Sequence, residues 1–128
     1  MTAYSYDHIH LRTPDPEKTA RYYNKMFDAR IIETPQAGGN TRIDLDLNGL
    51  TIFLAGAMAA GTEIQGQPDP HYGLDHFGLK VDDLDSAVTE LKTRGAEFTS
   101  EPRTLPSGVK IVFIKAPDDV RIELLQRP

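Results

Sequence analysis

Residues 7–12 read Asp-His-Ile-His-Leu-Arg, and residues 75–80 read Asp-His-Phe-Gly-Leu-Lys. In both stretches the histidine, His8 or His76, stands seven residues before an aspartate. The alternation of side chains in each stretch predicts a β-strand, and the acidic cluster that follows predicts the start of a helix. A motif that recurs in this way indicates an internal duplication. The sequence therefore predicts two copies of one small structural unit.

The first copy, residues 4–55, predicts the order β-α-β-β-β. A helix is expected after Asp15 because this residue can cap its N-terminus and Pro16 suits its first turn. Asn48-Gly49 is a strong signal for a two-residue hairpin turn. The expected elements are strand 6–13, helix 16–27, strand 30–34 and hairpin strands 42–47 and 50–55.

The second copy, residues 74–126, repeats this order after a Gly- and Pro-containing linker over 56–73. Its expected elements are strand 74–81, helix 83–94, strand 96–100 and strands 109–115 and 120–126. Alternation on the last strand makes Ile122 and Leu124 face the helix, so Glu123 should share a face with His76. Two copies of this size are marginal alone, so we expect them to share a core or a partner, within a single domain of residues 1–128.

Charge and composition exclude several classes of function. The chain of 128 residues has a net charge of -5, and its Lys and Arg residues are scattered, so a nucleic-acid-binding surface is not expected. No stretch approaches the roughly 20 apolar residues of a membrane span, and the N-terminal residues do not read as a signal peptide. The absence of cysteine excludes thiolate metal ligands. We expect a cytoplasmic protein without a nucleic-acid or membrane partner.

Two histidines and one glutamate are the candidate metal ligands. If each copy curls its sheet and the two sheets lie side by side, their concave faces form an open, barrel-like trough in which His8, His76 and Glu123 converge. Two neutral imidazoles and a carboxylate with open coordination positions suit Fe2+, Mn2+, Zn2+ or Ni2+. His10 shares a face with His8 at a distance that suits contact with a substrate, and we assign it as a candidate general acid or base.

These motifs resemble those of the vicinal oxygen chelate superfamily, which includes glyoxalase I, methylmalonyl-CoA epimerase, extradiol dioxygenases, and fosfomycin and bleomycin resistance proteins. The resemblance rests on residues 7–12 with Asp15 and Tyr22-Tyr23, on residues 75–83 with Leu91-Lys92 and Gly95, and on residues 117–124. It implies an α+β fold of two βαβββ modules with curved mixed sheets. It also implies that His8 and His76 are the first-strand metal ligands and that Glu123 is the last-strand ligand.

One position departs from the pattern of the glyoxalase and epimerase members. These proteins carry a fourth ligand in the last strand of the first module, where this chain has Phe53. The remaining two-His-one-carboxylate set is similar to that of extradiol dioxygenases and fosfomycin-modifying enzymes. Asp44 or Asp46, on the polar face of the preceding strand, could replace the missing ligand if the register differs from the one expected.

The resemblance implies a metalloenzyme for a small-molecule substrate with vicinal oxygens. Dioxygenase chemistry is slightly favoured by the open ligand set, whereas the chain length favours a glyoxalase- or epimerase-like lyase or isomerase. A metal-free protein that binds an antibiotic is a further alternative. Four basic residues could anchor an anionic substrate if they point into the trough, although solvated surface is their more common position: Arg12, Arg42, Lys80 and Arg121. A homodimer is expected, with modules paired within a chain or across subunits.

Overall fold

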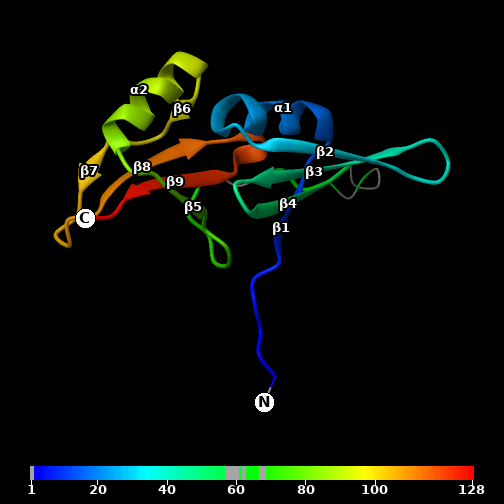
Figure 1. The fold of residues 1–128 in the computed structure, drawn as a ribbon, viewed down its shortest axis with the longest axis horizontal. Helices are drawn as coiled ribbons and strands as arrows, with labels where there is room; N and C mark the ends of the chain where they lie inside the picture. The colour runs from blue at the N-terminus through cyan, green and yellow to red at the C-terminus, as the bar shows by residue number, and fades with distance from the viewer. Residues whose placement is uncertain (1, 57–60, 62, 67–68) are drawn as a thin grey trace. The chain divides into compact units, whose positions relative to one another are not determined.

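The computed structural model describes residues 2–56, 61, 63–66 and 69–128. The chain divides into two compact units, residues 1–63 and 64–128. In the described part of the chain, each unit consists of a mixed β-sheet and an α-helix that packs on it (Figure 1). This composition confirms the expected α+β class.

The first unit follows the expected order of elements. They are β1 (His8–Arg12), α1 (Pro16–Phe27), β2 (Arg30–Pro35), β3 (Thr41–Leu47) and β4 (Leu50–Ala55). The sheet has the strand order β1-β4-β3-β2, with β1 parallel to β4 and the other neighbours antiparallel. The inner face of α1 buries Ala20, Tyr23 and Met26, and the sheet buries Leu45 and Ile52. These apolar residues form the core of the unit.

Local chemistry sets the bounds of α1. The Asp15 side chain accepts a hydrogen bond from the backbone N–H of Lys18 at 3.0 Å, and Pro16 occupies the first helical position. The helix ends at Phe27 and is followed by Asp28, which adopts a left-handed conformation with φ 57°. The helix therefore spans the range that the sequence predicts.

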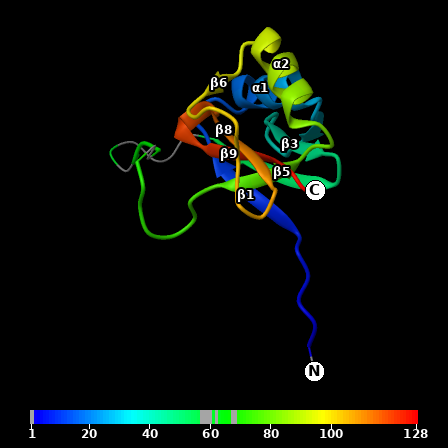
Figure 2. The ribbon, with the colours of Figure 1, turned by 90° about the vertical axis from the view of Figure 1, so that its left-hand side faces the viewer.

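The second unit repeats the arrangement with one additional short strand, β7. Its elements are β5 (Phe77–Lys80), α2 (Leu84–Arg94), β6 (Glu97–Phe98), β7 (Arg103–Thr104), β8 (Lys110–Lys115), the 3-10 turn η1 (Pro117–Asp119) and β9 (Arg121–Gln126). The strand order is β5-β9-β8-β6, and β7 pairs with β8. Figure 2 shows β5, β9 and β8 side by side, with α2 on one face of their sheet. Ile122 and Leu124 are buried, as the alternation predicts.

The structure differs from the sequence prediction at three strands of this unit. β5 begins at Phe77, so His76 immediately precedes the strand. The strand expected over 96–100 is reduced to two residues, and β7 was not expected. Both short strands depend on pairing with β8, a tertiary contact that local propensity does not encode.

The connection between the units is described only in part. The linker expected over 56–73 contains residues 57–60, 62, 67 and 68, which lie outside the described residues. The trough between the two sheets and the bounds of the two modules stay predictions. Neither α1 nor α2, the α-helices of the described ranges, has the length and apolar character that crossing a bilayer demands.

Candidate metal centre

His76 is held by a carboxylate through one of its ring nitrogens. The Nδ1 atom of His76 lies 2.6 Å from Oδ2 of Asp75, and Nη1 of Arg121 lies 2.5 Å from the same oxygen. The hydrogen bond from His76, together with the positive charge of Arg121, lowers the pKa of the Asp75 carboxyl below its usual value. An ionised Asp75 can only accept a hydrogen bond, so Nδ1 of His76 is the donor, and a metal at this site would bind through Nε2.

Glu123 faces the other ring nitrogen of this imidazole, Nε2. Its Oε2 atom lies 3.7 Å from Nε2 of His76. The pairing of Glu123 with Gly78 on β5 fixes its face of the sheet, because Ile122 and Leu124 point to the opposite, buried face. The Glu123 side chain is about one-fifth exposed. The structure thus brings two of the three expected ligands together.

An aromatic ring contacts the imidazole of His76, and a guanidinium contacts that aromatic ring. The Phe113 ring on β8 meets it edge to face, with ring centroids 5.1 Å apart. The guanidinium carbon of Arg121 lies 4.6 Å from the centroid of the same ring. Sequence reasoning counts Arg121 among possible substrate anchors, whereas the structure pairs it with Asp75. Phe113 contacts the imidazole of His76 directly, whereas Arg121 contacts the two residues that support it, Phe113 and Asp75.

The first unit holds His8 in a corresponding way. Nδ1 of His8 lies 2.6 Å from Oδ2 of Asp7, and the imidazole stacks on Phe53 with centroids 4.0 Å apart. The Asp7 side chain is 85% exposed, and it has no arginine partner among the described residues. The recurring Asp-His pair leaves Nε2 available in both units, but Asp7 holds its histidine with less support than Asp75.

Each unit pairs an acid with an aromatic ring across its last two long strands, but the two residue types occupy opposite strands in the two units. In the first unit Phe53 on β4 pairs with Asp44 on β3. In the second unit Glu123 on β9 pairs with Phe113 on β8. Phe53 also pairs with His10, two residues after His8, as Glu123 pairs with Gly78, two residues after His76. The register therefore places Phe53 at the position that corresponds to Glu123.

Asp44 lies in an environment that its sequence pattern does not predict. The alternation of β3 assigns it to a polar face, yet the residue is only 9% exposed. Its Oδ2 atom lies 2.8 Å from Nε of Arg42, and its Oδ1 atom has no hydrogen-bond partner among the described residues. The guanidinium of Arg42 lies over Phe53, with its central carbon 4.6 Å from the ring centroid.

The predicted ligand set draws on residues of both units. His8 belongs to residues 1–63, whereas His76 and Glu123 belong to residues 64–128. No cluster of three or more His, Asp or Glu side chains within the described ranges is suited to hold an ion. The role of the three residues as a common centre therefore stays a prediction.

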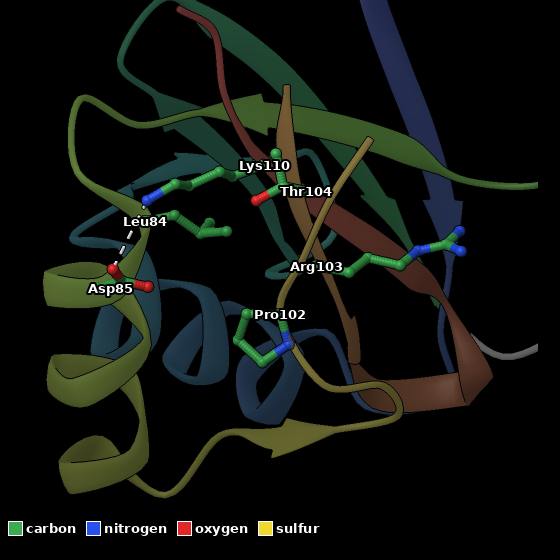
Figure 3. Close-up of a pocket in the computed structure, with 6 residues that line it drawn as sticks. All are labelled: Leu84, Asp85, Pro102, Arg103, Thr104 and Lys110. Carbon is green, nitrogen blue, oxygen red and sulfur yellow. Dashed lines mark ion pairs between the residues drawn. The ribbon is translucent and has the colours of Figure 1, made fainter. Parts of the chain in front are cut away.

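A small pocket of about 110 Å³ lies elsewhere in the second unit. Its lining comes from the start of α2, the segment that enters β7, and β8: Leu84, Asp85, Pro102, Arg103, Thr104 and Lys110. Figure 3 shows Lys110 directed toward Asp85, with 3.7 Å between Nζ and Oδ2, while Arg103 points away from this pair. The candidate ligands are not part of its lining.

Comparison with known proteins shows relatives over the whole chain. The chain is 24% identical to a lactoylglutathione lyase from Schizosaccharomyces pombe, over 99% of its own length and 49% of that protein. It is 27% identical to mitochondrial methylmalonyl-CoA epimerase from Homo sapiens, over 94% of its own length and 72% of that protein. The chain spans about half or less of the lactoylglutathione lyases from S. pombe and Arabidopsis thaliana.

The fold also matches a solved structure over its whole length. A glyoxylase/bleomycin resistance protein/dioxygenase domain from Frankia sp. EAN1pec superposes with a TM-score of 0.76 at 21% identity, covering 99% of this chain and all of that one. The family model of the Glyoxalase/Bleomycin resistance protein/Dioxygenase superfamily matches residues 5–124. The repeated unit, its strand register and this match together show that the chain belongs to that superfamily.

Proposed function

We propose that this protein is a metal-dependent enzyme that binds a small molecule through two neighbouring oxygens, with His8, His76 and Glu123 as the metal ligands. The observation that carries this proposal is the paired geometry of His76 and Glu123, whose Nε2 and Oε2 atoms face each other at 3.7 Å. Two ligand atoms that each bind one ion at about 2.0–2.2 Å lie roughly 3–3.6 Å apart. A small adjustment of either side chain would let both bind a common ion.

The second coordination shell supports the same proposal. Metal-binding histidines commonly donate their other ring N–H to a carboxylate, which fixes the tautomer and the orientation of the ring. Asp75 and Asp7 provide this carboxylate for His76 and His8. The donor set of imidazole and carboxylate fits Fe2+, Mn2+, Zn2+ or Ni2+.

We assign the reaction to proton transfer, in the lyase or isomerase class. A bound divalent cation would act as a Lewis acid that stabilises negative charge on the two substrate oxygens. None of the described residues hydrogen-bonds the ring of His10, which contacts the edge of Phe53 with centroids 6.3 Å apart. The imidazole of His10 is therefore available to take a proton from the substrate carbon and return it. The lactoylglutathione lyase and methylmalonyl-CoA epimerase relatives favour this class.

A dioxygenase is the second candidate, and Phe53 is the observation that favours it. Phenylalanine at the position that corresponds to Glu123 supplies no fourth ligand, so coordination positions would remain for a substrate and for oxygen. The sequence-based preference for this chemistry stays a prediction. Oxygen consumption with a panel of catechols would support this candidate, whereas its absence beside measured proton exchange would support the lyase or isomerase class.

Metal stoichiometry tests the ligand set directly. Protein loaded with Zn2+ or Ni2+ and desalted should hold one ion per chain by elemental analysis, and His8→Ala, His76→Ala and Glu123→Gln should each lose most of it. His71→Ala is the matched control, because the hydrogen bonds of this ring with described residues go to the backbone oxygens of Asp69 and Leu74. Equal metal content in all five proteins would refute the ligand set.

Deuterium exchange tests the reaction class. The wild type should incorporate deuterium from heavy water at the acidic carbon of methylmalonyl-CoA or lactoylglutathione, as followed by NMR. His10→Gln should slow this exchange by about 100- to 10,000-fold, the usual contribution of a general acid or base, while it retains the metal. Exchange at the wild-type rate in His10→Gln would remove His10 from the reaction.

A further inference from the structure

Arg42 and the candidate metal ligand His8 both contact the ring of Phe53. Its guanidinium carbon lies 4.6 Å from the centroid of Phe53, and the same ring stacks on His8 at 4.0 Å. Its Nε atom lies 2.8 Å from Oδ2 of Asp44. All four residues belong to the first unit. The guanidinium is thus fixed by a ring on one side and a carboxylate at one nitrogen.

A buried carboxylate anchors this arginine. The Asp44 side chain is 12% exposed, whereas that of Arg42 is 47% exposed. A strand carboxylate with little access to solvent has few alternative partners, so it holds Nε of Arg42 in one place. This contact uses one edge of the guanidinium. Neither Nη1 nor Nη2 of Arg42 has a partner in the described ranges, and these atoms form the edge that binds a carboxylate or phosphate through two hydrogen bonds.

Two other arginines of the sheets show how Arg42 differs. Arg121 lies over Phe113 at the same distance of 4.6 Å, but its Nη1 atom is bound to Asp75. Arg30 pairs with Asp46 at 3.2 Å, yet its side chain is 70% exposed. Arg42 combines a fixed orientation with an open bidentate edge.

We infer that Arg42 binds an anionic group of the substrate, a carboxylate, phosphate or phosphonate, that lies next to the two metal-binding oxygens. The inference rests on the proposed function, because it takes His8 as a metal ligand. The net charge of -5 gives the protein no general attraction for anions, so a local site of this kind is needed to bind one. Asp44 offsets part of the charge of Arg42, so the planar fork of donors, more than net charge, provides the binding.

A matched set of chelators separates anion binding from metal binding. Acetohydroxamate presents two neighbouring oxygens without a further charge, and the monohydroxamates of succinic and glutaric acid add a carboxylate to the same group. Calorimetry on the Zn2+-loaded protein should show that one of the charged probes binds about 10-fold or more tightly than acetohydroxamate, as a charge-assisted hydrogen bond provides. Arg42→Gln should abolish this gain and leave the affinity for acetohydroxamate unchanged.

Two further variants make the test specific. Arg42→Lys keeps the charge but lacks the fork, so most of the gain should be lost. Arg30→Gln removes an arginine that pairs with Asp46, which lies on the same strand as Arg42. The gain in affinity should be retained in this variant. A gain that persists in Arg42→Gln, or that is absent from the wild type while acetohydroxamate binds, would overturn the role of Arg42.

A metal-free measurement distinguishes failure of this inference from failure of the proposed function. If acetohydroxamate does not bind to the wild type, chelation at the proposed centre is refuted, and titration of the metal-free protein with inorganic phosphate then decides the anion site. The NMR resonance of the Arg42 Nε–H group should shift on titration in the wild type and in Arg30→Gln. An unchanged resonance at a phosphate concentration of tens of millimolar would refute the anion site.

Discussion

Replacement of Asp75 by asparagine should weaken metal binding more than the same replacement of Asp7. Both carboxylates lie 2.6 Å from Nδ1 of the following histidine. Asp75 also binds Arg121 and is half as exposed, with 43% of its side chain accessible against 85% for Asp7. The hydrogen bond from His76 and the charge of Arg121 lower the pKa of Asp75, so it is ionised at neutral pH. Its loss removes a charged, fixed support of the imidazole.

The expected magnitude follows from this difference in support. Loss of a carboxylate that orients a metal-binding histidine commonly weakens metal affinity by about 10- to 100-fold. We expect Asp75→Asn to fall within this range and Asp7→Asn to fall at or below its lower end, because solvent already competes for Asp7. Arg121→Gln, which leaves Asp75 in place, should weaken metal affinity by an amount between the effects of Asp7→Asn and Asp75→Asn.

Competition with a chromophoric chelator for Zn2+ at pH 7 measures these affinities, and circular dichroism checks that each variant is folded. The reasoning would be refuted if Asp75→Asn bound Zn2+ as tightly as the wild type, or if Asp7→Asn had the larger effect. Loss of structure in Asp75→Asn would be recognised from the spectrum, and Arg121→Gln would then test the same support through its own affinity.

Three further outcomes are expected. Leu124→Ala, at a residue that is 1% exposed, should lower the free energy of unfolding by about 2–5 kcal/mol in urea, whereas Ile64→Ala, at a residue that is 84% exposed, should change it by less than about 0.5 kcal/mol. Asp83 caps α2, and its hydrogen bond from the Ser86 N–H lowers its pKa. The wild type should therefore be more stable than Asp83→Ala above about pH 4, and this advantage should disappear as the pH falls through the lowered pKa. Thermal melts at several pH values measure this difference in stability. Light scattering at micromolar concentration should give twice the mass of one chain, and a monomer would contradict the predicted homodimer.

Local patterns in the sequence predict most of the fold. The cap at Asp15, the left-handed Gly95 after α2 and the turn at Asn48-Gly49 each depend on residues that are close in sequence. Alternation also predicts that Ile122 is buried and that Glu123 shares a face with His76. The sequence overestimates the length of β6 and does not predict β7, because each has only two residues and pairing with β8 rather than propensity stabilises them.

The sequence suggests the candidate ligands, which stay a prediction, but it does not suggest the residues that support them. His76 and Glu123 stand out from their strand patterns, whereas the contact of Arg121 with Asp75 joins residues that are 46 positions apart. No local signal indicates that contact. The burial of Asp44 is also hidden, because an acid in an alternating strand reads as solvent-exposed and only the folded sheet reveals its low accessibility.

The opposite placement of acid and aromatic ring in the two units restricts how the proposed ligand set could gain a fourth member by mutation. Phe53→Glu alone would place a second carboxylate directly across from Asp44, and like charges in a cross-strand pair are destabilising. Phe53→Glu combined with Asp44→Phe would instead copy the arrangement of the second unit, where Glu123 faces Phe113. Either single step passes through an intermediate with two acids or two aromatic rings in the pair. A pair of aromatic rings is favourable across strands, whereas a pair of acids is not, so a route to a fourth ligand in the proposed set should change Asp44 before Phe53.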